Sequence, residues 1–513
     1  MARIAVIGAG MGAMAAAARL AVAGHRVAVY ERGPTHGGAL GRFERDGFAF
    51  DTGPGLLHLP AVYRDLFVKT GKEPLERCVE LSQVDPAADH VFPDGTRLRL
   101  PNASRGGVLA ALDGAFGAGS GERWSELVNR ARDTWDATRR PLLEEPLRAD
   151  WSALRRDPYP VPPRRGWFRR GAGRPATLAD IAARELGDPR AVALLESHAL
   201  AQGLDPRAAP AGATVLPYLE QTFGSWYVRG GMRALADAVY ERCRARKVEF
   251  SFGTEVTGIT TADGRVTGLL LGGGAPPVAA DAVVAGVHPA VLPALTDGAS
   301  PWAEGDVRPA GGAADGPPGR LTVLLALSGA RPAGTAHRTV VHAGDRDAEL
   351  SAVFGGRSAP GAPVGRPTVT VLRPDDPATR PDEDHEAVTL TATVAPHGAV
   401  DWADPAVAEA AADRLVAAAG AAIPGLAGRV LWREVRTPHD VAAGTGAPGG
   451  AVPPPALAGV DGRLLRPANL TRTPGLYLAG GWAHPGGGLP HAGMSGALVA
   501  GLIVEGAGWR GSQ

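Results

Sequence analysis

The sequence predicts an α/β protein with more than one domain, and three features of the chain support this class. The first 30 residues alternate strand, helix and strand, residues 105–225 show the helical spacing of apolar side chains, and residues 320–396 alternate in steps of two, as strands do. A chain of 513 residues is also too long for one ordinary core, so we expect two or three domains.

The chain opens with a predicted βαβ unit. Residues 3–7 (RIAVI) form the first strand, 11–23 an alanine-rich helix and 26–30 (RVAVY) the second strand. The loop before the helix reads Gly8-Ala9-Gly10-Met11-Gly12-Ala13, and Glu31 follows the second strand. In such a loop the first glycine permits a tight turn, the second lets the backbone approach a pyrophosphate, and the acidic residue accepts from ribose hydroxyls. The motif predicts a dinucleotide site, with a ligand-free glycine-rich turn as the plainer alternative.

Composition excludes several classes of protein. The 53 basic and 53 acidic side chains balance, so no partner of the nucleic-acid type is expected. Cys78 and Cys243 have no metal-ligand spacing and form no disulfide framework, which predicts no metal site and a cytoplasmic location. Residues 4–24 resemble a secretory signal, but they carry the glycine motif and Arg19, and no other window is apolar enough to span a membrane.

Residues 105–225 read as an inserted helical cap. Helices are expected at 122–138, 177–187, 189–203 and 212–223. Within the cap, residues 139–174 hold ten arginines and four acids, interleaved with aromatic side chains. Two readings stay open: a solvated basic loop, or a surface that contacts anionic headgroups at the inner face of the plasma membrane.

The second half of the chain returns to strands. The strands expected within 248–286 read as the second half of the nucleotide-binding sheet, and residues 320–396 as a mixed or antiparallel sheet, followed by a helix at 405–419 and a strand at 429–435. The expected domains are therefore the following: a nucleotide-binding domain of 1–75, 226–295 and 460–513, a substrate domain of 76–104 and 296–459, and the cap of 105–225.

Two further motifs give a family resemblance. Gly37-Gly38 follow Glu31 after five residues, which extends the dinucleotide fingerprint as in FAD-dependent oxidoreductases. With FERDGFAFDTGPGLLHLP at 43–60 and TPGLYLAGGWAHPGGGLPHAGMSGALVAG at 473–501, the chain resembles the phytoene desaturase family of carotenoid-type FAD enzymes. The PGLYLAGG-x2-HPGGG-x-P arrangement is most similar to the bacterial hydroxyneurosporene and methoxyneurosporene desaturases.

The resemblance implies a Rossmann-type FAD-binding domain and a cofactor, FAD, that accepts hydride from a long apolar polyene or isoprenoid substrate. Oxygen or a quinone would then reoxidise the flavin. The residues implied at the cofactor are Gly8, Gly10, Met11, Gly12, Ala13, Glu31, Arg32, Gly37, Gly38, Arg42, Gly53, Pro54, Val256, Gly480, Gly481 and Pro490 to Met494. Val256 would touch the adenine, and Pro490 to Met494 would lie near the isoalloxazine. Where the family carries arginine after the double glycine this chain has Ala39, and we expect Arg42 to substitute for it.

Several questions of chemistry stay open at the sequence level. Desaturation also releases a proton, and His58, His484 and His491 are candidate acceptors, with plain packing as the alternative for each. The same scaffold serves isomerases, saturases and oxidative cyclases. A flavin amine oxidase would use Trp482 in an aromatic cage, although no lysine follows Lys247. A non-catalytic protein that keeps FAD is the last alternative, motivated by alanine at positions 13 and 39.

Overall fold

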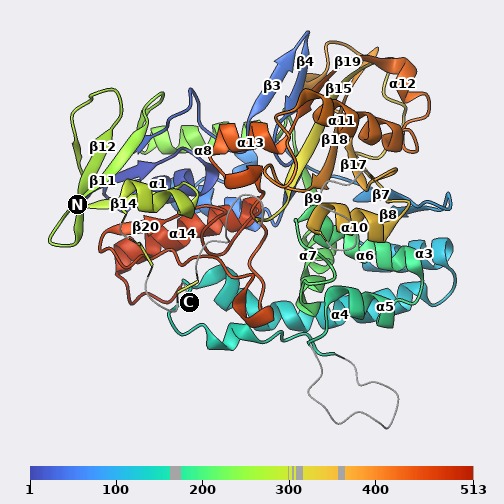
Figure 1. Ribbon diagram of the computed structural model, residues 1–513, viewed down its shortest axis with the longest axis horizontal. Coiled ribbons are helices and arrows are strands. Elements are labelled where there is room, and N and C mark those ends of the chain that lie inside the picture. Colours follow the sequence, from blue (N-terminus) through green and yellow to red (C-terminus); the bar gives the residue numbers. More distant parts are fainter. Residues whose placement is uncertain (162–174, 299, 303–305, 308–315, 356–363, 512–513) are drawn as a thin grey trace.

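The computed structural model describes residues 1–161, 175–298, 300–302, 306–307, 316–355 and 364–511. Figure 1 shows three regions: a parallel sheet with its helices on the left, a larger sheet at the upper right, and a group of helices below it. The three-domain division by residue range stays a prediction.

The first region is built on a five-stranded parallel sheet in the order β10-β2-β1-β14-β20. Its strands are β1 (Arg3–Ile7), β2 (Arg26–Tyr30), β10 (Glu249–Ser251), β14 (Ala282–Ala285) and β20 (Leu476–Leu478). The alternation of β1 explains its position between two layers. Ile4 and Val6 pack with helix α1 (Met11–Val22), whereas Ala5 and Ile7 pack with a second, smaller sheet.

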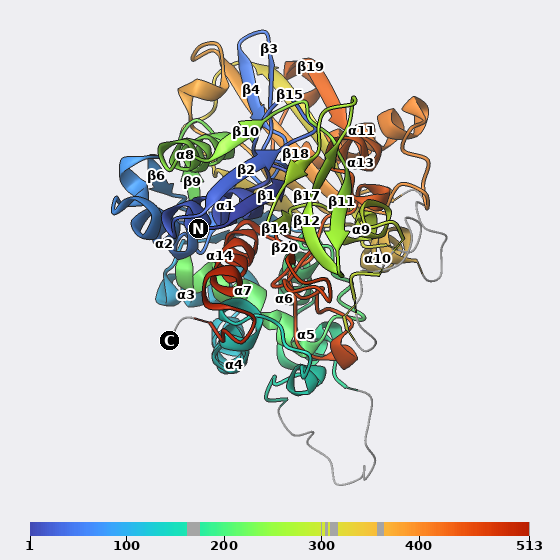
Figure 2. The same ribbon diagram turned by 90° about the vertical axis from the view of Figure 1, so that its left-hand side faces the viewer.

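Helices cover one face of this sheet and a small sheet covers the other. The helices are α1, α2 (Ala61–Gly71), α8 (Met232–Ala245) and α14 (Leu489–Glu505). The small antiparallel sheet is β11 (Val256–Ala262), β12 (Arg265–Leu271) and β13 (Val278–Ala279), which Figure 2 shows as a separate ribbon. The assignment of residues 255–271 to the nucleotide-binding sheet was therefore wrong, because Leu269 and Ile259 cover that sheet's face and do not extend its edge.

The second region is a seven-stranded sheet in the order β19-β15-β18-β17-β16-β7-β8. Its strands are β7 (Ala88–Val91), β8 (Arg97–Leu100), β15 (Gly319–Ser328), β16 (Arg338–Val341), β17 (Val369–Leu372), β18 (His385–Val394) and β19 (Val430–Arg436). All neighbours are antiparallel except β16 and β7, so the sheet is mixed, as predicted. Helix α11 (Pro405–Ala419) covers one face with a buried stripe of alanine and leucine.

The third region consists of helices with one common core. They are α3 (Arg105–Phe116), α4 (Ser120–Arg139), the π-helix Arg140–Glu144, α5 (Leu178–Glu185), α6 (Pro189–Ala201) and α7 (Val215–Phe223). Their starts follow from local chemistry: Thr177 and Asp180 form a capping box before α5, and Asp188 caps α6, whose first residue is Pro189. The core of these helices includes Leu457 and is contacted by Met494, so it reaches the C-terminal segment.

The remaining elements connect these regions. Two short sheets are β3 (Arg42–Arg45) with β4 (Phe48–Asp51), and β5 (Leu57–His58) with β9 (Ser225–Val228) and β6 (Leu81–Gln83). The other helices are α9 (Leu292–Leu295), α10 (Arg346–Phe354), α12 (Leu426–Arg429) and α13 (Pro438–Thr445), and the 3-10 turns are Leu75–Arg77, Ser152–Arg155, Ala211–Thr214, Pro289–Val291, Pro377–Thr379, Pro448–Gly450 and Val460–Gly462.

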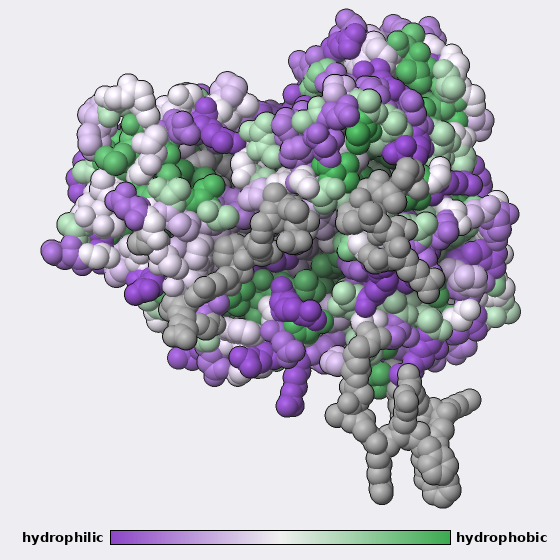
Figure 3. All heavy atoms as spheres, viewed as in Figure 1, coloured by the Kyte–Doolittle hydropathy of each residue, from purple (hydrophilic) through white to green (hydrophobic). Residues whose placement is uncertain are grey.

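None of the helices in the described residues is both long and apolar enough to cross a bilayer. On the face in Figure 3, polar and apolar residues are interspersed. The same described residues contain no cluster of histidine, cysteine or acidic side chains suited to a metal ion.

Candidate active site

The glycine loop after β1 lies beside the double glycine. The Gly8 N–H donates to Tyr30 O at 2.8 Å, and the Gly37 N–H donates to Ala9 O at 2.8 Å. Gly8 has φ of +87° and Gly37 has φ of +103°, conformations that side chains with a Cβ rarely adopt. The two predicted motifs therefore form one paired structure at the carboxyl edge of the parallel sheet.

The C-terminal motif closes on the same loop. A Cβ atom at Gly12 would lie 2.7 Å from Gly480 Cα and 2.9 Å from Ala492 O, so only glycine allows this contact. The Gly480 N–H donates to Ser495 Oγ at 3.0 Å, and the Asn469 side-chain amide donates to the same oxygen at 3.0 Å. The N-terminal glycine loop and the C-terminal motif are therefore in backbone contact, as expected if both belong to one flavin site.

Space and polarity at this junction fit the predicted dinucleotide. A Cβ atom at Gly10 or at Gly480 would meet no described atom within 4 Å, so both backbones border open space. Gly10 caps α1 without a side-chain hydrogen bond, which leaves N–H groups of the first helical turn for an anion. These residues would hold the phosphates of FAD.

Glu31 is placed for the ribose but is already engaged. Its carboxylate accepts from the Ala9 N–H at 2.7 Å and from the Gly33 N–H at 2.7 Å. A carboxylate has about four acceptor positions, so these two bonds orient Glu31 and leave capacity for hydroxyl donors.

The alanine that replaces the third motif glycine is accommodated. A Cβ atom at Gly286, directly after β14, would lie 2.8 Å from the Ala13 Cβ. The glycine therefore stands on the strand side of the contact, and close packing of helix and sheet is preserved.

Other predicted cofactor residues make different contacts. Arg32 Nη2 donates to Ala443 O at 3.1 Å, near the end of α13. Arg42 pairs with Glu44 at 2.6 Å and donates to Gly230 O at 3.2 Å. Val256 is half-buried at the start of β11 and packs in the same core as Tyr30, next to Glu31.

Sequence reasoning missed Arg233, which supports the double-glycine loop. Its Nη1 donates to His36 O at 2.9 Å, its Nη2 to Thr35 Oγ1 at 3.0 Å, and its Nε to Asp237 at 2.7 Å. These contacts fix residues 35 and 36, which precede the double glycine. Directly after the double glycine this chain has Ala39 where the family has arginine. The sequence signal was its position directly after Gly230-Gly231-Met232, in a segment expected to belong to the nucleotide-binding domain.

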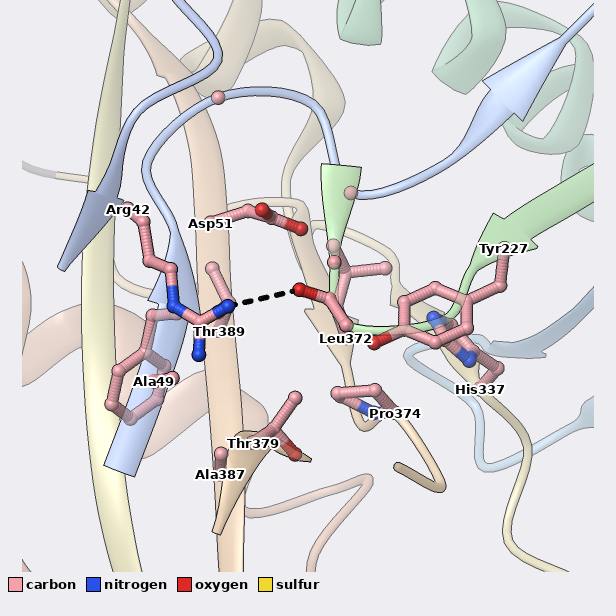
Figure 4. Close-up of a pocket in the computed structure, with 15 residues that line it drawn as sticks. Arg42, Ala49, Asp51, Tyr227, His337, Leu372, Pro374, Thr379, Ala387 and Thr389 are labelled. Atoms are coloured by element: carbon pink, nitrogen blue, oxygen red, sulfur yellow. Dashed lines mark hydrogen bonds between the residues drawn. The ribbon is translucent and has the colours of Figure 1, made fainter. Parts of the chain in front are cut away.

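A first cavity lies between the β3–β4 ribbon and the large sheet (Figure 4). Arg42 and Asp51 stand on one side and Tyr227 and His337 on the other, and Gly53 also lines it. Pro54 is half-buried beside this glycine. The Tyr227 hydroxyl donates to Asp376 at 2.8 Å, and its ring lies 4.7 Å from that of His337, centroid to centroid.

Asp51 caps helix α8 at the rim of this cavity. Its carboxylate accepts from the N–H groups of Met232 at 2.7 Å and Arg233 at 3.1 Å. Burial raises the pKa of Asp51 to about 6, although the two backbone bonds and nearby Arg42 oppose this rise and Asp376 adds to it.

We expect this carboxyl to make stability pH-dependent. The folded state holds the Asp51 proton more tightly than the unfolded state, so its contribution is fully present below pH 3.8 and is lost as pH rises through about 6. The loss is at most about 3 kcal/mol. Urea unfolding of FAD-free protein between pH 4 and 7 should show this slope, and Asp51→Asn should flatten it. The exposed Asp46→Asn serves as the control, and an unchanged slope in Asp51→Asn would contradict the assignment.

The three candidate histidines occupy unlike surroundings. His484 is fully buried, its Nε2 lies 2.9 Å from Glu145 O, and burial lowers its pKa to about 4. It therefore ties the C-terminal motif to the π-helix. His58 lies 3.4 Å from Ser225 Oγ, and burial lowers its pKa. Neither histidine lines the first cavity or the second cavity that His491 lines.

His491 lines a second cavity, between the helical region and the C-terminal segment. The lining is mostly apolar and consists of Thr134, Trp135, Thr138, Leu142, Leu143, Pro158, Gly212, Val215, Leu216, Leu219, Pro455, Ala456, Leu457, Ala458 and His491. Burial lowers the pKa of His491 to about 4, so the imidazole is neutral at physiological pH. Pro490 is buried next to it, and Met494 one turn further along α14 packs against the helical core.

Comparison with curated proteins yields carotenoid enzymes. The chain is 30% identical over 293 residues to 4,4'-diapolycopene oxygenase of Methylomonas sp., a match that covers 57% of this chain and 56% of that protein. It is 29% identical over 514 residues to hydroxyneurosporene desaturase of Rhodobacter capsulatus, covering 98% of this chain and 97% of that protein. The chain thus aligns with about half of the first relative and with nearly all of the second.

Solved structures share the fold. An oxidoreductase from Methanosarcina mazei superposes with a TM-score of 0.62 at 17% identity, covering 97% of this chain and 99% of that chain. A family model described as flavin containing amine oxidoreductase matches residues 14–504. Because this match spans nearly the whole chain, the protein belongs to the flavin containing amine oxidoreductase family, and its cofactor is FAD.

Proposed function

We propose that the protein is an FAD-dependent desaturase or dehydrogenase that acts on a long apolar polyene or isoprenoid chain. The observation that carries this proposal is the second cavity, whose described lining holds no carboxylate and only one ionisable side chain, the neutral His491. Such a lining suits a hydrocarbon chain and gives no counter-ion to a protonated amine. The names of the two curated relatives support the same substrate class.

The chain's own residues supply binding and exclusion of water. The first turn of α1 and the backbones of Gly10 and Gly480 would hold the cofactor, with Glu31 at its ribose. FAD, when bound, takes up the hydride that the substrate loses. Leu142, Leu216 and Leu219 line the second cavity with apolar surface, which keeps water from a substrate chain lying there.

Two alternatives have less support. In an amine oxidase Trp482 would belong to an aromatic cage, but its ring contacts the edge of His288 at 4.4 Å between centroids, and no lysine follows Lys247. In a non-catalytic protein the glycine loop would be degraded, but Gly286 compensates for Ala13. Isomerase, saturase and cyclase outcomes share the same site and are separated by product analysis.

The test is an absorbance spectrum followed by anaerobic additions. We expect a flavin spectrum in the purified protein, bleached by at least one of phytoene, neurosporene and hydroxyneurosporene supplied in liposomes. Bleaching by simple amines with release of hydrogen peroxide in air would instead establish amine oxidation. A flavin that responds to dithionite but to no polyene would refute the substrate class, and a flavin that no reductant bleaches would favour a non-catalytic role.

For reoxidation we propose oxygen or a quinone, and for residues 139–174 a contact with an anionic membrane surface. Five of the ten arginines, at 164, 165, 169, 170 and 174, lie outside the described residues. Among the others, Arg139 and Arg140 pair with Glu144 and Glu145, which suits a solvated loop equally well. Flotation with anionic and neutral vesicles decides: equal flotation with both would remove the membrane contact.

A further inference from the structure

Arg466 is a buried cation without an anionic partner among the described residues. The residue is 6% exposed, and its one hydrogen bond within the described part of the chain runs from Nε to Pro454 O at 3.3 Å. Burial lowers the pKa of Arg466 to about 10, so the guanidinium still carries its charge at neutral pH. A buried charge without a counter-ion destabilises a fold, which indicates that this side chain has a partner outside the protein.

The terminal nitrogens of Arg466 are open to such a partner. Nη1 and Nη2 make no hydrogen bond to the described residues, and both keep accessible surface. The surroundings are otherwise apolar, because Leu465 and Ala456 belong to a buried cluster with Leu142. An anion bound there would interact with the guanidinium more strongly than it does in water.

The guanidinium lies beside the loop that leads into α14. Pro454 O accepts from Arg466 Nε and also, at 3.0 Å, from the Gly487 N–H. The next residue, Gly488, caps α14 without a side-chain hydrogen bond, so the first N–H groups of this 17-residue helix have no partner from a cap. A helix N-terminus and a buried arginine both favour negative charge, and here they are neighbours.

We propose that Arg466 is the counter-ion for the negative charge that the flavin gains on reduction. This rests on the proposed function and on the expected position of the isoalloxazine near Pro490 to Met494, in the first turns of α14. When the substrate loses a hydride from one carbon and a proton from the next, the proton leaves to water. The hydride's hydrogen, its two electrons and its negative charge stay with the cofactor. Arg466 is unpaired before this transfer and paired after it, so it favours the reduced cofactor.

The experiment measures the midpoint potential of bound FAD against a reference dye during photoreduction, which requires no substrate. In Arg466→Met we expect reduction to become about tenfold less favourable, which lowers the potential by about 30 mV for a two-electron couple. Arg466→Lys keeps the charge and should retain most of the wild-type potential. The affinity for oxidised FAD should stay close to that of wild type, because the oxidised isoalloxazine is uncharged.

A matched variant and a stability measurement exclude a purely structural role. Arg463 is exposed and donates to Val460 O at 3.2 Å, so Arg463→Met should leave the potential unchanged. In the FAD-free protein, Arg466→Met should be at least as stable to urea as wild type, because it removes a buried charge without a counter-ion. A less stable variant with the wild-type potential would show that Arg466 only supports the fold, and would overturn the proposal.

A ligand carboxylate is the other possible source of the anion, and sodium dodecanoate tests it. If dodecanoate shifts the spectrum of oxidised wild type but not of Arg466→Met, while the two potentials are equal, Arg466 serves a ligand and the assignment to the flavin is wrong. The proposed function fails separately. Unequal potentials without bleaching by any polyene would refute the substrate class and keep the role of Arg466, whereas bleaching with equal potentials would do the reverse.

Discussion

Gly10→Val is expected to abolish FAD binding while leaving the fold intact. Gly10 has φ of −73° and ψ of 166°, which valine adopts readily, and a Cβ atom there meets no described atom within 4 Å. The added methyl groups enter the space that we assign to the dinucleotide. We expect the FAD dissociation constant to rise more than 100-fold, or about 2.8 kcal/mol, measured by fluorescence titration of FAD-free protein.

Two comparison variants test the reason for this effect. Gly106→Val also places its side chain in open space, in α3 far from the glycine loop, and should leave FAD affinity unchanged. Gly12→Val should lose both affinity and stability, because its Cβ would lie 2.7 Å from Gly480 Cα. Retention of FAD affinity within tenfold in Gly10→Val would show that the cofactor lies elsewhere.

Arg373→Met is expected to destabilise the fold strongly. Arg373 Nε and Nη2 donate to the two carboxylate oxygens of Glu386 at 2.7 and 2.8 Å, and the two side chains are 6% and 1% exposed. Removing Arg373 leaves Glu386 with Arg429 as its one ion-pair partner among the described residues. Losing one partner of a buried pair costs about 3–5 kcal/mol, which urea unfolding at pH 7 would measure.

A second substitution identifies the cause. If the buried charge of Glu386, left with Arg429 alone, is responsible, Arg373→Met with Glu386→Leu should recover much of the lost stability. Arg45→Met removes an exposed pair with Asp46 and should change stability by less than about 1 kcal/mol. A cost below about 1 kcal/mol for Arg373→Met would contradict the prediction. Leu372, Pro374 and Ala387 flank the pair and line the first cavity, so its loss should also loosen that wall.

Local pattern predicted the elements well where one physical cause dominates. The strands at 3–7 and 26–30 and the helix at 405–419 have the predicted bounds. The strands between 255 and 271 were found, but alternation reports only that one face is buried. It does not report which sheet buries it, and that information lies in contacts with β1 and β14.

The candidate site divides in the same way. The glycine loop could be predicted because its function is performed by the backbone, which a motif of glycines reveals directly. Asn469 supports the loop from outside both motifs, and no local pattern marks it. Arg233 and Ser495 stand next to or within glycine-rich segments, but the pattern does not indicate that their side chains hold the loop. His484 and His491 stand in one motif with the same expected role. The structure separates them because one side chain is hydrogen-bonded to Glu145 and the other lines a cavity.

The strand order of the parallel sheet has a consequence for how the enzyme acquires its cofactor. The FAD site is built from β1 and α1, near the start of the sequence, and from β20, Gly480 and α14, near its end. At about 5–20 residues per second, synthesis of the second part follows the first by roughly 20 to 90 seconds. During that interval the glycine loop is already synthesised, but Gly480 and α14, which pack against it, are not. FAD can therefore meet both walls of its site only after residues 476–505 have been synthesised, and until then β14 is an uncovered edge of the parallel sheet.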